Sequence, residues 1–397
     1  MRRIASTPRS DWPRLVEKVG LTYHLHDDPV SPRPYWNESA CYEFSEAEVL
    51  SLEKVIHDLH YLLIDVAEEV VTRGWWERLS ISEAMVPMIE ASWTNDDFSL
   101  YGRFDFAWVP GREPKVLEYN ADTPTALVEA AVVQWYWLED TRPKMDQFNS
   151  IHERLIEGWR RYHGLYPSIQ VIDFACLGEN KEDEQTISYL MDTAQNAGLG
   201  TRWTEMGDIG WDNENHIFVG GGQPGIPSEP IVACFKLYPW ELMWREPFGA
   251  MLPHAPTFWI EPPWKALLSN KAILAIAWEL HPGHPNLLPC FLEEAKAGKT
   301  YVKKPKLGRE GCNITVVRDG RVAQQTDGPY GDGGFVFQAL AEIPDFQGNR
   351  PVFGGWVVDH EPAGLGVRES DGLVTDNQSR FVPHFMLRER LKAPGID

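Results

Sequence analysis

The stretch that decides the fold lies at residues 101–120 and reads YGRFDFAWVPGREPKVLEYN. Two strand-like segments rich in aromatic and β-branched residues flank a turn that contains proline and glycine, which is the pattern of a β-hairpin. Successive residues of a strand point to opposite faces, so Arg103 and Asp105 share one face of the first strand. For the same reason, Glu118 and Asn120 share a face of the second strand.

The pairing of these strands predicts a cluster of oxygen ligands. If the strands pair about a four-residue loop at 110–113, Asp105 faces Glu118 and Arg103 faces Asn120. Carboxylates opposed at ~5 Å destabilise a sheet unless a cation lies between them. One solution is Mg²⁺, which completes its shell with water and phosphate oxygens. The other is a solvated hairpin in which Arg103 pairs with the acids, and the spacing alone leaves both open.

The segment that follows the hairpin carries a helix-start signal. Thr123 as N-cap with Pro124 in the first turn predicts a helix over Thr125–Leu138. The free amides of such a helix start would lie beside the carboxylates, where they could bind a substrate carboxylate or form an ordinary cap. Both interpretations remain open at this point.

A third element lies at residues 300–314, TYVKKPKLGREGCNI. A strand would deliver Lys304, and a loop with Gly308 and Gly311 could bind phosphate oxygens through its amides. The loop is neither a P-loop nor a dinucleotide fingerprint. The other glycine-rich stretch, Gly220–Gly225, precedes Ile-Pro instead of a helix, so we interpret it as a plain loop.

Patterns elsewhere predict a mixed α/β chain. Ser45 and Glu48 form a capping box that begins a long amphipathic helix ending at Gly74. The other predicted strands are Phe98–Trp108, Lys115–Asn120, Ile169–Ala175, Ile217–Val219, Ile231–Leu237, Thr300–Lys304, Ile314–Arg318, Phe335–Ala341, Val352–Asp359 and Gly364–Arg368. The other predicted helices are His152–Tyr162, Glu184–Ala197 and Ala266–Leu280.

Composition narrows the class of protein. The 397 residues include 37 Lys and Arg against 58 Asp and Glu, a net charge of −21, which argues against nucleic acid as a partner. Approach of a cationic ligand such as a polyamine would be favoured, although solubility alone can explain the charge. No apolar run reaches the ~20 residues of a membrane span. The five scattered cysteines form no zinc or disulfide pattern, and the start MRRIASTPRSDWPRL has no signal-peptide core, so we expect a cytoplasmic protein that does not bind membranes.

Two histidine pairs are weak candidates for metal ligands. His24 and His26 precede two aspartates, and His281 and His284 lie among turn residues. Neither pair has a further set of ligands at a typical spacing, so we do not expect a metal there.

Five segments taken together carry a resemblance: RFDFAW, KVLEYNADTPT, EPPWKALLSNKAIL, YVKKPKLGREGCNI and GGWVVDHEPAGLGVRESDGLVTDNQSRFVPH. In order and over nearly the whole chain, they resemble the glutathionylspermidine synthase family of ATP-grasp carboxylate–amine ligases. The resemblance implies an α+β and α/β chain with an ATP-grasp fold of the glutathione synthetase-like type and a flexible lid. It also implies one synthetase unit over 1–397, with a metal-binding hairpin in 1–165, an α/β substrate segment in 166–262, and the lid and nucleotide-binding part in 263–397.

The resemblance implies roles for individual residues. Asp105, Glu118 and Asn120 would hold one or two Mg²⁺ ions, and Arg103 and Arg368 would be catalytic cations at the transferring phosphoryl group. Thr123 and Thr125 would bind the substrate carboxylate. The ATP-binding residues would be Arg103, Phe104, Asp105, Lys271, Lys304, the lid residues Gly308, Arg309, Glu310 and Gly311, the hinge residues Gln338, Ala339, Leu340 and Ala341, and Leu373, Val374 and Thr375.

The implied activity is ADP-forming ligation of a peptide-like or glutathione-like carboxylate to an amine such as a polyamine, through an acyl phosphate. Bifunctional members carry an amidase domain for which this chain has no room, so only synthetase activity is expected. Leu237 stands where a polar glutathione contact would be expected, which leaves the acid unnamed. A small-molecule kinase and a non-catalytic ATP-binding protein are the alternatives, and the sequence leaves the oligomeric state open.

Overall fold

The computed structural model describes residues 1–26, 33–178, 180–221 and 228–387. The predicted hairpin is confirmed: β3 (Tyr101–Ala107) and β4 (Lys115–Asn120) pair antiparallel, with Asp105 opposite Glu118. Arg103 faces Asn120, also as predicted. A β-bulge after Asp105 shifts the register by one residue, and the turn is longer than the four residues expected.

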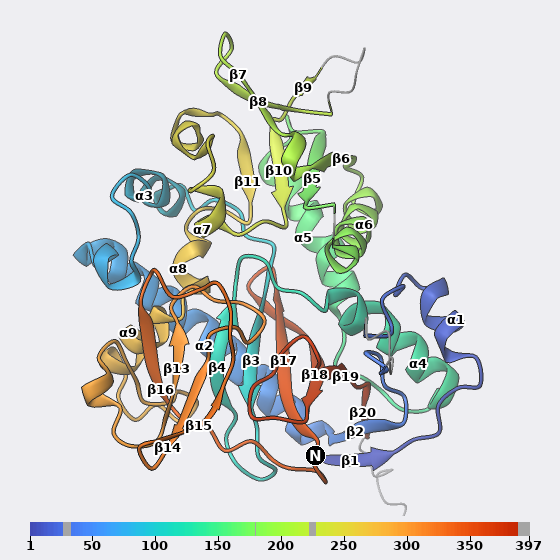
Figure 1. Ribbon diagram of the computed structural model, residues 1–397. Helices are drawn as coiled ribbons and strands as arrows, with labels where there is room; N and C mark the ends of the chain where they lie inside the picture. The colour runs from blue at the N-terminus through green and yellow to red at the C-terminus, as the bar shows by residue number, and fades with distance from the viewer. Residues whose placement is uncertain (27–32, 179, 222–227, 388–397) are drawn as a thin grey trace, which may run out of the picture.

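The hairpin is the edge of a five-stranded antiparallel sheet that lies at the centre of Figure 1. Its strand order is β19-β18-β17-β3-β4, with β17 at Arg350–Val358, β18 at Glu361–Ser370 and β19 at Arg380–Phe381. Strands from the expected N-terminal and C-terminal segments therefore pair within one sheet. This pairing brings Arg368 of β18 to the same sheet as Arg103 of β3.

A long helix, α2 (Glu46–Arg73), covers the back of this sheet. It begins with the predicted capping box between Ser45 and Glu48 and ends at Gly74, which has a left-handed φ of 66°. Gly355 lets the helix approach closely, because a Cβ at that position would lie 2.6 Å from a methyl carbon of Ile56. The apolar side of α2 covers one face of the sheet, and polar side chains lie on the opposite face.

A second five-stranded sheet stands beside the hairpin, with the order β12-β16-β13-β14-β15. The bounds of its strands are β12 Cys290–Phe291, β13 Tyr301–Pro305, β14 Thr315–Arg318, β15 Arg321–Gln325 and β16 Phe335–Ala339. All of its neighbours pair antiparallel, and Val302 faces Gln338. Lys304 therefore reaches the hairpin from the end of β13.

A parallel sheet forms the upper part of Figure 1, with the order β11-β10-β5-β6. Its strands are β5 (Val171–Cys176), β6 (Gly200–Glu205), β10 (Ala233–Lys236) and β11 (Phe258–Ile260). Helices α5 (Ile151–Leu165) and α6 (Lys181–Asn196) pack beside it. The carboxyl ends of β5 and β10 lead into loops that approach the hairpin, as is usual for binding loops of parallel sheets.

The predicted helix Ala266–Leu280 is interrupted. It forms as α8 (Lys265–Ser269) and α9 (Ala272–Leu280), because Asn270 has an extended backbone between them. The buried Asn270 amide donates to the carbonyl of Leu79 at 2.7 Å, and its oxygen accepts from the amide of Ala272 at 2.9 Å. This break places Lys271 at the start of α9.

The predicted helix start at Thr123 is wrong. The helix begins at Leu127, because Ala126 adopts a left-handed φ of 62° and the hydroxyl of Thr123 accepts a hydrogen bond from Arg309 instead of capping. After Leu127 the helix contains a π-turn, η2 (Glu129–Val133), and continues as α4 (Gln134–Thr141). Residues 123–126 are consequently a loop in the wall of the site.

The remaining strands form two small sheets: β1 (Arg2–Ala5), β2 (Ala40–Ser45) and β20 (His384–Leu387), and β7 (Gly210–Asp212), β8 (Ile217–Gly220) and β9 (Glu229–Pro230). The remaining helices are α1 (Trp12–Lys18), η1 (Trp76–Leu79), α3 (Val86–Thr94), η3 (Met206–Asp208), α7 (Trp240–Met243), η4 (Gly249–His254) and η5 (Glu294–Lys296). Most of the glycine-rich loop interpreted at Gly220–Gly225 lies outside the described residues. Among the helices described, none combines the length and apolar character needed to span a bilayer.

Candidate active site

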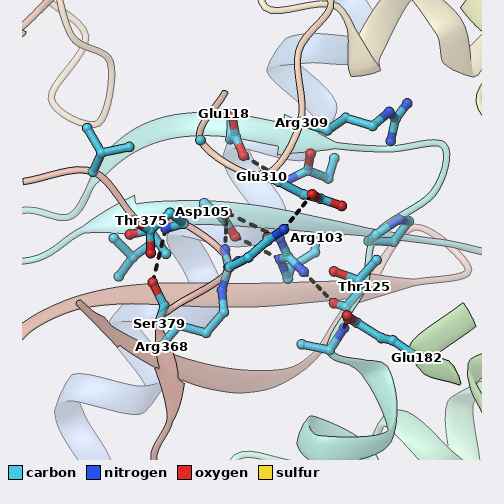
Figure 2. Close-up of a pocket in the computed structure, with 18 of the residues that line it drawn as sticks. Arg103, Asp105, Glu118, Thr125, Glu182, Arg309, Glu310, Arg368, Thr375 and Ser379 are labelled. Carbon is cyan, nitrogen blue, oxygen red and sulfur yellow. Dashed lines mark hydrogen bonds and ion pairs between the residues drawn. The ribbon is translucent and has the colours of Figure 1, made fainter. Parts of the chain in front are cut away.

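One cavity of about 930 Å³ runs along the open face of the hairpin. Its walls come from the central sheet, the β13–β16 sheet, the loop that follows β13, and the loops that follow β5 and β10. Figure 2 shows its middle, where Arg103 and Arg368 converge on Asp105, with Thr125 and Glu182 on one side and Thr375 and Ser379 on the other.

Asp105 is held between two arginines. Nε of Arg103 donates to its Oδ1 at 2.8 Å, and Nη2 of Arg368 donates to its Oδ2 at 2.5 Å. Arg103 also donates to the carbonyl of Thr125. Arg103 and Asp105 are nearly fully buried, so this charge cluster lies largely out of water. The sequence left open an Mg²⁺ site or a hairpin in which Arg103 pairs with the acids. In the structure Arg103 does pair with Asp105, and this pair lines a cavity.

Glu118 lies between two lysines. Lys271 Nζ is 3.0 Å from Oε2 of Glu118, and the amide of Asn120 donates to Oε1 at 3.1 Å. Burial opposes ionisation of Glu118, but Lys271 and Lys304 more than offset it, so its pKa lies well below the ordinary value. Burial lowers the pKa of Lys304, and Glu118 counters part of that effect.

The hairpin offers two carboxylates and one amide oxygen to a metal. Within the described ranges, no group of three or more His, Cys, Asp or Glu side chains is arranged to enclose an ion. Asp27 and Asp28, which follow His24 and His26, lie outside those ranges. Two carboxylates plus phosphate oxygens are a common Mg²⁺ environment, so Asp105, Glu118 and Asn120 fit this ion in the presence of a polyphosphate.

The end of the cavity beside β13 and β16 is mostly apolar. It is lined by Val302, Ile314, Val316, Gln338, Ala339, Leu340, Ala341, Ile343, Leu373, Val374 and Thr375, which include the hinge residues expected to meet adenine. Lys304 lies at the inner edge of this wall, where its Nζ donates to Gln338 at 2.8 Å. A flat aromatic base would find a matching surface here.

The side chain of Phe104, one of the residues expected to bind the nucleotide, does not reach the cavity. Its ring is fully buried on the other face of β3 and stacks on Tyr119, with centroids 3.9 Å apart. This follows from the alternation of side chains along a strand. A role for Phe104 in nucleotide binding therefore has no support from its side chain.

The loop expected to be the lid lies across the cavity. Gly311 has a φ of 70°, and a Cβ there would lie 2.6 Å from the carbonyl oxygen of Thr375, so only glycine fits. Gly308 packs on Pro305, and its carbonyl accepts from Lys271 at 2.7 Å. The loop is thereby connected to the lysine that pairs with Glu118.

Arg309 extends from this loop to the other end of the cavity. It donates to the hydroxyl of Thr123, and at 2.9 Å to Oε1 of Glu241. Thr125 lies next to Glu182, whose Oε1 accepts from the amide of Ala126 at 3.2 Å. The two threonines expected at the substrate carboxylate thus lie in the cavity wall, one beside a cation and one beside an anion.

A carboxyl group buried behind this end of the cavity was missed by reasoning from sequence. The carboxylate of Glu129 is fully buried, and its Oε1 accepts from the hydroxyls of Tyr23 at 3.0 Å and Tyr35 at 2.5 Å. Its Oε2 has no hydrogen-bond partner among the described residues. Burial, helped by Glu182, raises the pKa of Glu129 to about 7, and burial likewise raises that of Asp183 to about 7.

The acidic end, defined as Glu182 and Asp183 in the cavity wall and Glu129 buried behind Tyr23 and Tyr35, comes from parts of the chain that are distant in sequence. The acids at 182–183 follow the N-cap Asn180 and are indistinguishable in sequence from the usual acidic first turn of a helix. Glu129 lies within an apolar helix, where a lone acid gives no pattern. Only the tertiary fold brings them together, so no sequence signal could have identified the cluster.

Comparisons with known proteins agree with this architecture. Residues 3–387 match the family model described as glutathionylspermidine synthase preATP-grasp. A Haemophilus influenzae protein provisionally named as an acid–amine ligase is 39% identical over 402 residues, which cover 98% of this chain and 100% of that protein. Trypanothione synthetase of Crithidia fasciculata is 26% identical, with 81% of this chain and 53% of that protein covered.

Two further similarities bear on length and fold. The bifunctional glutathionylspermidine synthetase/amidase of Escherichia coli is 25% identical over 88% of this chain, but the chain spans only 59% of that protein. Among solved structures, a glutathione synthetase-like effector of Globodera pallida in its apo form superposes with a TM-score of 0.53 at 8% identity, covering 94% of this chain and 98% of that one. The fold is therefore of the glutathione synthetase-like type.

Proposed function

The chain belongs to the glutathionylspermidine synthase family, and on this premise we propose that it is an ATP-dependent ligase that joins a carboxylate to an amine. The observation that carries the proposal is the order of surfaces along one cavity: an apolar end, a middle of cations and two carboxylates, and an acidic end. A nucleotide base, its phosphates with a divalent cation, and a positively charged amine match these three surfaces in turn.

The residues in the middle of the cavity fit a metal-bound nucleotide. Lys271 and Lys304 provide positive charge beside Glu118, as phosphate oxygens require. Asp105, Glu118 and Asn120 would hold one or two Mg²⁺ ions, which when bound would neutralise charge on the phosphate oxygens. Arg103 pairs with Asp105 from the same strand, β3, and Arg368 pairs with it from β18, which β17 separates from β3, so both arginines are held in place without a nucleotide.

The acid substrate would bind where the threonines meet Arg309. The guanidinium of Arg309 lies beside Thr123, and together they offer donors to a carboxylate. We propose that this carboxylate attacks the terminal phosphorus of ATP, so that ADP leaves and an acyl phosphate forms. The arginines at Asp105 would stabilise the charge on the transferring group, and the loop with Gly311 would exclude water.

The amine would bind at the acidic end. Glu182 and Asp183 line the cavity there, and burial raises the pKa of both carboxyl groups. An ammonium group bound beside them would favour their charged forms. The amine nitrogen would then attack the acyl carbon, release phosphate and lose a proton, leaving an amide. A polyamine is the amine we propose, and an acidic site for an ammonium group has no part in a simple kinase.

The free cysteines support a location for this activity. Cys41, Cys176, Cys234 and Cys290 are buried and unpaired, and Cys312 is unpaired in the loop over the cavity. Reduced thiols are typical of the cytoplasm, where we propose that the enzyme acts.

End-product analysis tests the proposed function. The protein would be incubated with Mg·ATP, peptide-like acids and polyamines, and ADP, free phosphate and product mass would be measured. Amine-dependent release of both ADP and phosphate, with a product one water lighter than acid plus amine, would establish the ligase. A phosphorylated product without free phosphate would contradict it and indicate a kinase.

A matched pair of variants tests the site. Glu118→Gln should lower ADP formation at least ~100-fold, because it removes a charged metal ligand beside Lys271. Glu113→Gln changes an exposed carboxylate in the turn of the same hairpin and should leave the rate unchanged. Equal activity of the two variants would refute the metal assignment.

A further inference from the structure

A second pocket of about 180 Å³ lies beside the main cavity and is lined by residues of β8, α7 and β11. Figure 1 shows where these elements lie. The wall of the pocket is almost entirely apolar. The lining residues that define this apolar side pocket are Leu177, Met206, Gly207, Ile209, Phe218, Tyr238, Met243, Glu246, Pro247, Phe248, Leu252 and Trp259. None of the roles derived above uses this pocket.

The apolar side pocket adjoins the end of the main cavity that would hold the acid. Leu177 and Tyr238 line both spaces, so these two residues form the boundary between them. The segment that carries Tyr238 continues into α7, where Glu241 accepts from Arg309. Because Arg309 also donates to Thr123, hydrogen bonds link the proposed carboxylate-binding residues to α7, which begins two residues after Tyr238.

The chemistry of the wall selects an apolar occupant. The two lining side chains that bear oxygen, Tyr238 and Glu246, bond to each other at 2.6 Å. Burial together with Glu246 raises the pKa of Tyr238 to about 12, so its hydroxyl stays a donor to that carboxylate. An apolar group that enters the pocket would therefore separate no polar group from its partner, whereas an anionic group would find no Lys, Arg or His among the lining residues.

The size of the pocket limits what can enter. A water molecule takes up ~30 Å³ of liquid, so 180 Å³ corresponds to about six waters. Sites for whole ligands usually begin at ~300 Å³. The pocket therefore suits one branched alkyl or aromatic side group of a larger molecule that is bound in the main cavity.

We propose that the apolar side pocket is a specificity site that receives an apolar side group of the acid substrate, attached next to the reacting carboxylate. The proposal deepens the ligase function and rests on it for the placement of the carboxylate beside Thr123 and Arg309. It names the class of acid as one with a branched or aromatic residue at its carboxyl end.

Binding measured without turnover tests this proposal. The probes are γ-glutamylglycine, γ-glutamyl-leucine and γ-glutamylphenylalanine, titrated calorimetrically into the full chain with Mg²⁺ and a non-hydrolysable ATP analogue. We expect the two apolar peptides to bind roughly 10- to 200-fold more tightly than γ-glutamylglycine. Equal affinity for all three peptides, or no measurable binding of any, overturns the proposal.

Filling the pocket supplies the matched comparison. Gly207→Phe adds a ring where a Cβ would meet no atom within 4 Å, and it should abolish the preference while leaving γ-glutamylglycine binding unchanged. Gly164→Phe is the control, since Gly164 lies on α5, outside both cavities, and its Cβ would also meet nothing within 4 Å. Leu252→Phe fills the pocket from η4 as a second variant. Retention of the preference in both filled variants overturns the proposal.

The test separates this proposal from the ligase function. A preference in binding without any ADP formation would leave the apolar side pocket assigned and would refute the ligase. If γ-glutamylglycine forms an amide and binds with the same affinity as the apolar peptides, the ligase function stands and the proposed role of the apolar side pocket is refuted.

Discussion

Replacing Glu129 by glutamine should make the empty protein more stable at high pH. Glu129 lies in the π-turn of η2, fully buried, with Tyr23 and Tyr35 donating to one oxygen and no partner at the other. Glutamine has the same shape and can still accept from both hydroxyls through its carbonyl oxygen. The substitution therefore removes a charge and little else.

The size of the effect follows from the pKa of Glu129, which burial and the neighbouring Glu182 raise to about 7 from an ordinary value of 4.5. Between these two values the folded protein keeps a proton that the unfolded chain has released, so stability falls as pH rises. The loss is small at pH 5 and complete above about pH 8. At about 1.4 kcal/mol per pKa unit, it corresponds to about 3 kcal/mol.

Urea unfolding at pH 5 and at pH 8.5 measures this difference. The wild-type free energy of unfolding should fall by about 2 to 3 kcal/mol more than that of Glu129→Gln over this interval, and the variant should be the more stable protein at pH 8.5. Glu139→Gln, at an exposed position on α4, should follow the wild type. Parallel pH dependence of the wild type and Glu129→Gln would refute the argument that this carboxylate is buried without compensation.

Three further outcomes are expected. Gly311→Ala should weaken binding of a fluorescent ATP analogue at least tenfold, because its Cβ would meet the Thr375 carbonyl. Gly320 has a similar φ of 76° but open space around its Cβ, so Gly320→Ala should leave binding unchanged. Equal effects of the two substitutions would refute a role for the close approach at Gly311. Lys236→Met should lower the free energy of unfolding by roughly 3–5 kcal/mol, because it leaves Asp122 buried and unpaired, and the double variant with Asp122→Asn should recover part of the loss in urea titrations; additive losses would argue against coupling. Removal of divalent cations with EDTA should abolish ADP formation and added Mn²⁺ should restore it, so activity that persists in EDTA would contradict the metal assignment.

Local chemistry explains what the sequence could predict. The pairing of Asp105 with Glu118 followed from strand alternation and a compact turn, and both depend only on neighbouring residues. The capping box at Ser45 and the left-handed Gly74 are local signals as well, and both formed. The features predicted correctly are therefore those whose cause lies within about twenty residues of chain.

The features that were missed depend on partners far away in sequence. Thr123 has the preferred residue type for an N-cap, but Arg309 occupies its hydroxyl and the helix begins four residues later. Asn270 interrupts an apolar run that looks continuous, because the carbonyl of Leu79 takes its amide. Glu129 lies among apolar residues in the sequence, and its hydrogen-bond donors are the hydroxyls of two tyrosines about a hundred positions earlier.

The net charge of the whole chain hides the electrostatics that matter for the proposed reaction. The total is −21, yet in the middle of the cavity four cations, Arg103, Arg368, Lys271 and Lys304, surround Asp105 and Glu118. The acidic end has three carboxyl groups, whose pKa values are raised by burial and, for Glu129 and Asp183, also by the neighbouring Glu182.

Each imbalance would be relieved by one substrate. Phosphate oxygens would compensate the cations of the middle, and an ammonium group would compensate the acidic end. Both arrangements destabilise the empty protein, and a fold optimised for stability alone would have paired these groups internally. Because the imbalances have opposite signs and share one cavity, they favour simultaneous binding of a polyanion and an amine, which is what an ATP-dependent carboxylate–amine ligase requires and a kinase does not.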